Sequence, residues 1–240
     1  MRILITGGAG YIGSVLTAWA LRNNYKVRAL DNLWFDKKIP LSHCYNSNYE
    51  FFKVDLLKAE LDDYLEDIDI IVHTAAVVGE PASRKFPELT KKVNYEASLS
   101  LIEKARNSSV KGFIFLSTCS NYGSSSNMAK EDMPLNPLSL YAETKVGVER
   151  YLMDKTQGLD WVICRLSTVY GVSPRMRFDL TINDFALNGY LNKYLDIFLP
   201  LSFRPYIHVF DVAKVILKIT ENFSKVKNNV FNVGFNGENY

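Results

Sequence analysis

A glycine-rich turn near the amino terminus constrains this chain more than any other feature. Residues 7–13 read GGAGYIG, directly after the apolar run Arg2–Thr6 and directly before a helical pattern over Tyr11–Asn23. Such a turn lets backbone N–H groups and the positive end of the helix meet a pyrophosphate. Spaced glycines alone are weak evidence, but here the strand and the helix that should flank them are both predicted. The residues expected to bind a dinucleotide here are Gly7, Gly10, Tyr11, Ile12 and Gly13.

Short apolar runs alternate with longer helical patterns along most of the chain. Several runs are apolar on consecutive residues, as expected when both faces of a parallel sheet are covered. The strands we expect are Arg2–Thr6, Lys26–Leu30, Tyr49–Val54, Asp69–His73, Gly112–Ser117 and Trp161–Arg165. The helices expected between them are Tyr11–Asn23, Leu56–Tyr64, Leu89–Asn107 and Ser139–Thr156. This alternation predicts an α/β fold with a Rossmann-like, doubly wound parallel sheet.

The alternation loosens after Arg165, where a basic loop over Ser173–Arg177 begins a less regular region. The elements expected in it are a helix over Phe178–Asn188, a strand around Tyr194–Leu199 and a helix over Val209–Asn222. We therefore divide the chain into a nucleotide-binding domain (1–170) and a small C-terminal substrate-binding portion (171–240) that is interleaved with the sheet.

An acidic residue follows the second predicted strand. Asp31 lies 18 residues beyond Gly13, where a carboxylate can accept both ribose hydroxyls of an adenosine and repels a 2′-phosphate. Arg28 could in principle favour such a phosphate, but residues at odd offsets along a strand face opposite sides. The sequence therefore predicts NAD rather than NADP.

Side chains that follow the next two strands complete the expected cofactor site. Asp55 and Leu56 come after the third strand, where they can reach the adenine. Ala75 and Ala76 come after the fourth, where small residues allow the cofactor to approach closely. His73 ends an apolar run with no second histidine nearby, so we interpret it as a structural residue.

A tyrosine and a lysine share one face of the helix expected over Ser139–Thr156. Tyr141 and Lys145 are four residues apart. A phenol is a poor base at neutral pH, but a neighbouring ammonium and an oxidised nicotinamide would lower its pKa. The hydroxyl-rich run Ser117–Ser120 leaves the fifth strand at the carboxyl edge of the sheet, where such sheets place their sites. Thr118 could there hold a substrate oxygen within reach of Tyr141.

Composition excludes several other classes of protein. The chain has 240 residues with a net charge of +2, so a dedicated nucleic-acid binder is not expected. No window approaches the length of a membrane span, and the start has no cleavable signal pattern. The three cysteines are too few and too far apart for a disulfide framework or a zinc site. We expect a cytoplasmic protein without a metal and without membrane or nucleic-acid partners.

Together these motifs resemble the extended short-chain dehydrogenase/reductase family, in its NAD-dependent nucleotide-sugar epimerase/dehydratase branch. TGGAGYIG matches the opening motif of that family, and the likeness covers nearly the whole chain. The resemblance implies a nucleotide-diphosphate sugar as substrate and Thr118, Tyr141 and Lys145 as catalytic residues. It adds Asn32, Asn94 and Ser117, together with Tyr141 and Lys145, to the cofactor contacts. The substrate contacts that it implies are Thr118, Cys119, Ser120, Thr168, Arg177 and Arg204.

Two departures from the family pattern bear on the reaction. Dehydratases and decarboxylases of the family carry an acidic residue just after the catalytic Thr, whereas Cys119 and Ser120 stand here. That pattern is closer to the 4-epimerases, which act through a keto intermediate. Thr168 stands where many epimerases have an Asn, which leaves the sugar open. A dehydrogenase that releases the keto-sugar, a 4,6-dehydratase and a non-catalytic NAD sensor remain alternatives.

The resemblance carries two further expectations. Family members commonly form homodimers in which the helices matching Leu89–Asn107 and Ser139–Thr156 pair into a four-helix bundle. The apolar residues compatible with that pairing, or equally with packing on the sheet, are Leu99, Ile102, Val148 and Leu152. Relatives also continue past the motif Asn232–Gly234, so we expect this chain to lack part of the substrate pocket.

Overall fold

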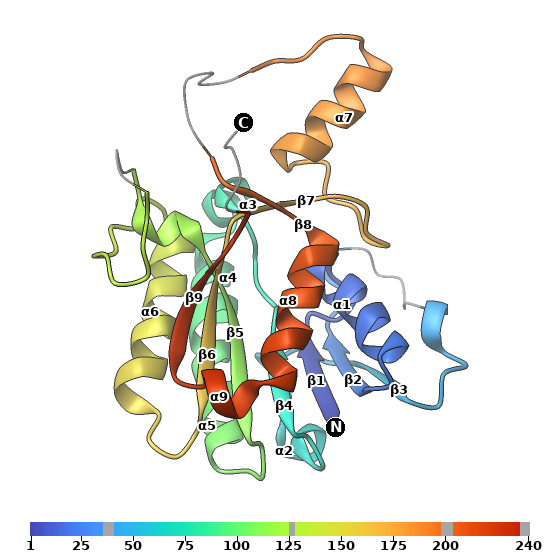
Figure 1. The fold of residues 1–240 in the computed structure, drawn as a ribbon, viewed down its shortest axis with the longest axis vertical. Coiled ribbons are helices and arrows are strands. Elements are labelled where there is room, and N and C mark those ends of the chain that lie inside the picture. Colours follow the sequence, from blue (N-terminus) through green and yellow to red (C-terminus); the bar gives the residue numbers. More distant parts are fainter. Residues whose placement is uncertain (36–40, 125–127, 198–203, 236–240) are drawn as a thin grey trace.

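A parallel sheet forms the centre of the computed structural model, which describes residues 1–35, 41–124, 128–197 and 204–235 (Figure 1). Within these residues the sheet has seven strands in the order β3-β2-β1-β4-β5-β6-β9, and each neighbouring pair is parallel. The strands are β1 (Arg2–Thr6), β2 (Lys26–Asp31), β3 (Tyr49–Lys53), β4 (Ile70–His73), β5 (Gly112–Thr118), β6 (Trp161–Leu166) and β9 (Asn229–Val233). The predicted Rossmann-like fold is confirmed, because the order reverses between β1 and β4 as in other doubly wound sheets.

Helices cover both faces of this sheet, which explains why its strands are apolar on consecutive residues. Helices α1 and α8 pack against one face together with the side chains of β1, β4 and β6. Helices α5 and α6 pack against the other face, where Phe113 and Phe115 of β5 are completely buried. The helices are α1 (Tyr11–Arg22), α2 (Asp62–Leu65), α3 (Glu80–Lys85), α4 (Pro87–Lys91), α5 (Ala97–Arg106), α6 (Leu140–Lys155), α7 (Thr181–Leu191), α8 (Val209–Glu221) and α9 (Phe223–Val226).

Two predicted helices differ from the structure. The helix expected over Leu56–Tyr64 is reduced to α2, because the Asp55 side chain accepts the N–H of Leu57 and turns the chain instead. The helix expected over Leu89–Asn107 begins earlier, at Pro87 in α4, and is interrupted by a π-helical segment, η2 (Lys92–Glu96), before α5. Such segments widen a helix locally and are frequent at functional sites.

The C-terminal region contains a second, smaller sheet. Its strands β7 (Thr168–Tyr170) and β8 (Tyr206–His208) pair in parallel, and neither was predicted. The strand expected around Tyr194–Leu199 is wrong over its described residues, because residues 194–197 are exposed and have no ladder partner. Its last two residues, 198 and 199, lie outside the described residues. Helix α7 projects from the body of the molecule beside this small sheet (Figure 1).

Candidate active site

A cavity of about 600 Å³ opens at the carboxyl edge of β1, β2 and β4. Most of the predicted cofactor residues line it: Gly7, Gly10, Tyr11, Ile12, Gly13, Asp31, Asn32, Asp55, Leu56, Ala75 and Ala76. This is the topological switch point of the sheet, where doubly wound folds bind their ligands. The structure thus brings together residues that span seventy positions of the sequence.

The glycine turn leaves no room for side chains on its inner side. A Cβ at Gly13 would lie 2.1 Å from the carbonyl oxygen of Gly7, and one at Gly10 would lie 3.0 Å from the same atom. Gly7 itself has φ = +71°, a conformation that favours glycine. The first N–H groups of an α-helix have no partner within the helix, and α1 begins at this turn. These residues therefore fit the diphosphate of a dinucleotide.

Asp31 ends β2 and lines the cavity. Its carboxylate accepts the N–H of Ala9 at 3.0 Å and that of Leu33 at 2.8 Å. Burial raises the pKa of Asp31, while these two bonds and the charge of Arg175 oppose the increase. Arg28 points away, as expected, and forms an ion pair with Glu50 at 2.8 Å. Among the described residues, Asp31 thus lines the cavity and Arg28 does not.

An aromatic wall beside Asp31 was not predicted. Trp34 packs edge-on against Phe35 and Phe86, with ring centroids 4.7 and 5.3 Å away. The guanidinium of Arg175 lies 4.5 Å from the centroid of the Phe35 ring. In the sequence, only the length of the loop after Asp31 pointed to this wall. The segment that carries Trp34 and Phe35 and the segment that carries Arg175 meet only in the folded chain.

The structure places Arg177, predicted for the substrate, in the wall of the same cavity. Its guanidinium pairs with Asp179 at 2.5 Å and lies against Gly79. Burial raises the pKa of both Tyr11 and Tyr141, and the charge of Arg177 opposes the increase at each.

Tyr141 and Lys145 lie on the first turns of α6, which Ser139 caps by accepting the N–H of Ala142 at 3.3 Å. The Nζ of Lys145 is 6.0 Å from the centroid of the Tyr141 ring and donates a hydrogen bond to the carbonyl of Leu116 at 2.9 Å. Burial raises the pKa of Tyr141 to about 12 and lowers that of Lys145 to about 7. Desolvation therefore outweighs the effect expected from the neighbouring ammonium.

Thr118 and the residues after it form the opposite side of this region. The Thr118 hydroxyl accepts the N–H of Ser120 at 3.1 Å and caps a short 3₁₀ helix, η3 (Cys119–Tyr122). Burial raises the pKa of the Cys119 thiol, and the charge of Arg204 opposes the increase. Thr168 begins β7 and donates its N–H to the carbonyl of Pro205 at 3.0 Å.

Four predicted cofactor residues are not among those that line the cavity: Asn94, Ser117, Tyr141 and Lys145. Asn94, on η2, is completely buried and exchanges hydrogen bonds of 2.7 and 2.9 Å with the backbone of Val77. The hydroxyl of Ser117 donates to Glu149. The side chains of Asn94 and Ser117 are thus hydrogen-bonded to groups of the protein itself. His73 is likewise enclosed, between Thr6 and Ser98.

The fold and this arrangement define a dinucleotide-dependent enzyme with a tyrosine–lysine pair beside its cofactor cavity. The model of the NAD dependent epimerase/dehydratase family matches residues 3–234. The chain belongs to that family and is an NAD-dependent enzyme. No helix among the described residues is long and apolar enough to cross a membrane.

Relatives and solved structures agree with this assignment. A putative UDP-glucose 4-epimerase of Methanocaldococcus jannaschii is 30% identical over 97% of this chain and 76% of its own length. The structure of UDP-glucuronic acid 4-epimerase from Bacillus cereus, with UDP-glucuronic acid and NAD, is 30% identical, has a TM-score of 0.88, and is matched over 99% of this chain and 78% of that one. A hexosamine 5,6-dehydratase, TunA, is 27% identical with a TM-score of 0.84, over 100% and 77%. The chain therefore spans about three quarters of these proteins.

Proposed function

We propose that this protein is a nucleotide-diphosphate-sugar 4-epimerase. The observation that carries the proposal is the grouping of Thr118, Tyr141 and Lys145 around the carboxyl end of β5. The two residues that follow Thr118 in the sequence also lack a carboxyl group. The similarity to UDP-sugar 4-epimerases supports the same reaction. NAD, when bound, would supply a hydride acceptor and, in its oxidised form, a positive charge.

The proposed roles follow from the chemistry of each side chain. The Tyr141 oxygen takes the proton of the sugar hydroxyl at C4 while the C4 hydride leaves, and it returns that proton when hydride is delivered to the other face. Thr118 orients the hydroxyl by hydrogen bonding. Lys145 places an ammonium near the phenol. Burial raises the pKa of Tyr141 to about 12, the charge of Arg177 opposes the increase, and the positive charge of oxidised NAD would further favour the phenolate.

The availability of a proton donor separates epimerisation from dehydration. Elimination of water needs an acid beside the sugar, and neither Cys119 nor Ser120 can supply a carboxyl group. Glu149 is bound to Arg165 in a buried ion pair, so it is not a free acid either. A dehydratase remains the weaker alternative for this reason. A dehydrogenase would instead accumulate reduced cofactor together with the keto-sugar.

We further propose that residues 171–240 contribute Arg204 to the sugar site, where it acts together with Thr168, Cys119 and Ser120 of the nucleotide-binding domain. Incubation with a panel of UDP-, dTDP-, GDP- and CDP-sugars, followed by NMR and mass spectrometry, tests the whole proposal. The expected product has the mass of the substrate and inverted configuration at C4. A product lighter by one water, or by two hydrogens, would refute it.

We also propose a homodimer, although not through three of the four apolar residues named from the sequence; the fourth, Leu99, is partly buried. Ile102, Val148 and Leu152 are completely buried within one chain, so they cannot form an interface. The outward-facing apolar residues of these helices are Tyr95 and Met153, which are 38% and 41% exposed. Light scattering after size-exclusion chromatography should give twice the mass of one chain, and Tyr95→Asp should reduce it to that of one chain.

A further inference from the structure

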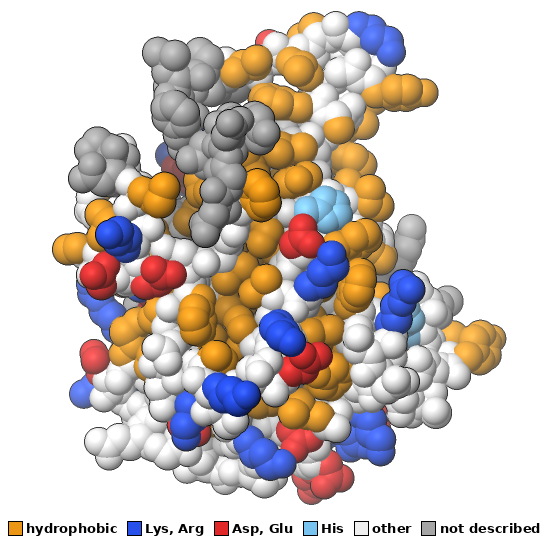
Figure 2. All heavy atoms as spheres, in the orientation of Figure 1, with side chains coloured by type: hydrophobic (Ala, Val, Ile, Leu, Met, Phe, Trp, Pro, Cys, Tyr) orange, Lys and Arg blue, Asp and Glu red, His pale blue; other side chains and the backbone are white. Residues whose placement is uncertain are grey.

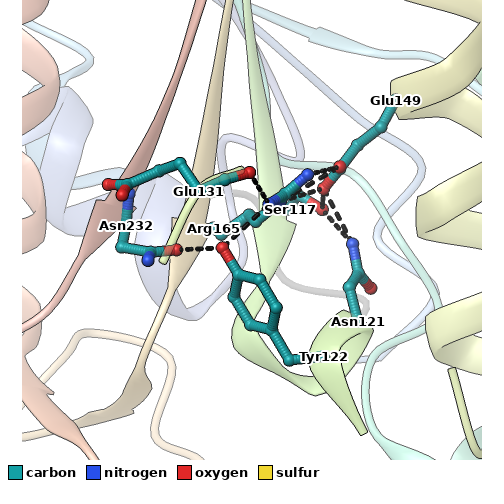
Figure 3. A network of polar contacts seen from close by, with 7 residues as sticks. All are labelled: Ser117, Asn121, Tyr122, Glu131, Glu149, Arg165 and Asn232. Atoms are coloured by element: carbon teal, nitrogen blue, oxygen red, sulfur yellow. Dashed lines mark hydrogen bonds and ion pairs between the residues drawn. The ribbon is translucent and has the colours of Figure 1, made fainter. Parts of the chain in front are cut away.

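A buried polar network joins α6 to β5, β6 and η3 (Figure 3). At its centre the Glu149 carboxylate of α6 forms an ion pair with Arg165 of β6, with 2.7 Å between Oε2 and Nη2. The two side chains are 0% and 3% exposed. Removing two charges from water costs free energy that a buried pair recovers only in good geometry, so such a pair is weak evidence for stability. Its position relative to the site is more informative.

Glu149 binds the chain on both sides of Thr118. Its Oε1 atom accepts a hydrogen bond from Ser117, the residue before Thr118. The same oxygen accepts one from Nδ2 of Asn121, three residues after Thr118, at 2.7 Å. Figure 3 shows Ser117 and Asn121 converging on this carboxylate from β5 and η3. One side chain of α6 therefore holds the whole turn that carries Thr118.

Glu149 also shares its helix face with the tyrosine–lysine pair. Tyr141, Lys145 and Glu149 are spaced four residues apart, so successive members lie one above the other on α6. Lys145 donates to the carbonyl of Leu116 at 2.9 Å, one residue before Ser117. Lys145 and Glu149, one helical turn apart on the same face of α6, thus attach the tyrosine-bearing helix to the end of β5.

Arg165 connects the Glu149 carboxylate to other elements of the fold. Its Nη1 atom donates to the Tyr122 hydroxyl at 2.8 Å and to the carbonyl of Glu131 at 3.0 Å. The Tyr122 hydroxyl in turn donates to Oδ1 of Asn232, on β9, at 2.7 Å. The orientation of the carboxylate is therefore set by β6, β9 and the segment that contains Glu131.

We propose that Glu149 and Arg165 are positioning residues, which set the distance between the Thr118 hydroxyl and the Tyr141 oxygen. The inference rests on the proposed function, because that distance matters only if both groups hold the same sugar hydroxyl. Small displacements of such groups reduce turnover more than they reduce binding. The cofactor cavity lies on other elements and does not depend on the pair.

Glu149→Gln and Arg165→Lys test the inference, with Lys227→Met as a control that removes one partner of an exposed ion pair, Lys227–Asp160. The Gln oxygen still accepts from Ser117 and Asn121, so this variant isolates the ion pair. We expect kcat to fall about 10- to 100-fold in both variants, with KM and the Kd for NAD within about threefold of wild type. A kcat within about twofold of wild type would overturn the proposal.

Hydrogen–deuterium exchange provides a readout that needs no substrate. Both variants should exchange faster over residues 117–123, with protection over residues 2–22 unchanged; unchanged exchange over 117–123 would overturn the inference. If wild type converts no nucleotide sugar, the proposed function fails while this measurement still decides whether the pair holds the Thr118 turn. If Glu149→Gln does not fold, Ser117→Ala removes one contact without leaving a charge unpaired, and the same two results are expected.

Discussion

Replacing Gly13 by alanine should abolish cofactor binding. The new Cβ would lie 2.1 Å from the carbonyl oxygen of Gly7 and 2.9 Å from Cα of Gly8, and both neighbours are backbone atoms. Real Cβ atoms essentially never come closer than 3.0 Å, so the turn would have to open by about 0.9 Å. Overpacking of this kind typically costs about 1–3 kcal/mol. Because the same shift displaces the cradle, the Kd for NAD should rise by about 100-fold or more.

Isothermal titration calorimetry with NAD measures this effect, and Gly189→Ala provides the control. Gly189 lies in α7, where an added Cβ would be 3.4 Å from its nearest neighbour. That substitution should leave the Kd unchanged and raise stability by about 0.5–1 kcal/mol, since Gly is unfavourable within a helix. If Gly13→Ala binds NAD within about threefold of wild type, the cradle is not where the dinucleotide lies.

Three further substitutions test other parts of the site. Tyr141→Phe should lower kcat by about 1,000-fold or more while NAD still binds, because only the transferable proton is lost; turnover near that of wild type would contradict its role. Asp31→Ala should weaken NAD binding about tenfold and shift preference toward NADP, so an unchanged ratio of the two Kd values would contradict the ribose contact. Burial holds the pKa of Lys145 at about 7, well below that of an unfolded lysine, so the unfolded chain binds more protons above that pH. The free energy of unfolding of wild type, relative to that of Lys145→Met, should therefore rise between pH 7 and pH 10 in urea titrations. If the difference between the two free energies does not change with pH, Lys145 is solvated in the folded protein.

The parts of the fold that local patterns determine were predictable. Consecutive apolar residues mark buried parallel strands, and the glycine turn marks the first crossover, so β1, α1, β2 and the switch point followed directly. β7 and β8 are three residues each and exist only because they pair with one another, far apart in the sequence. β9 was missed for a similar reason, since its partner β6 is separated from it by most of the C-terminal region.

The site divides in the same way. Residues that follow a strand, such as Asp31 and Ala75, were placed correctly in the cavity, because the carboxyl ends of parallel strands meet at one edge. Arg177 lies on an irregular loop, where no periodicity fixes its direction. The ion pair of Glu149 with Arg165 joins two elements whose side chains both point inward, and only the four-residue spacing from Tyr141 hinted at it.

The most direct test of the central claim follows the hydrogen at C4 of the substrate. The wild-type protein would be incubated with a UDP-sugar carrying deuterium at C4, and the products analysed by NMR. An epimerase returns the same hydride, so the inverted sugar should keep its deuterium at C4. Deuterium found at C6 of a dehydrated sugar, or in released reduced cofactor, would contradict the proposed epimerisation.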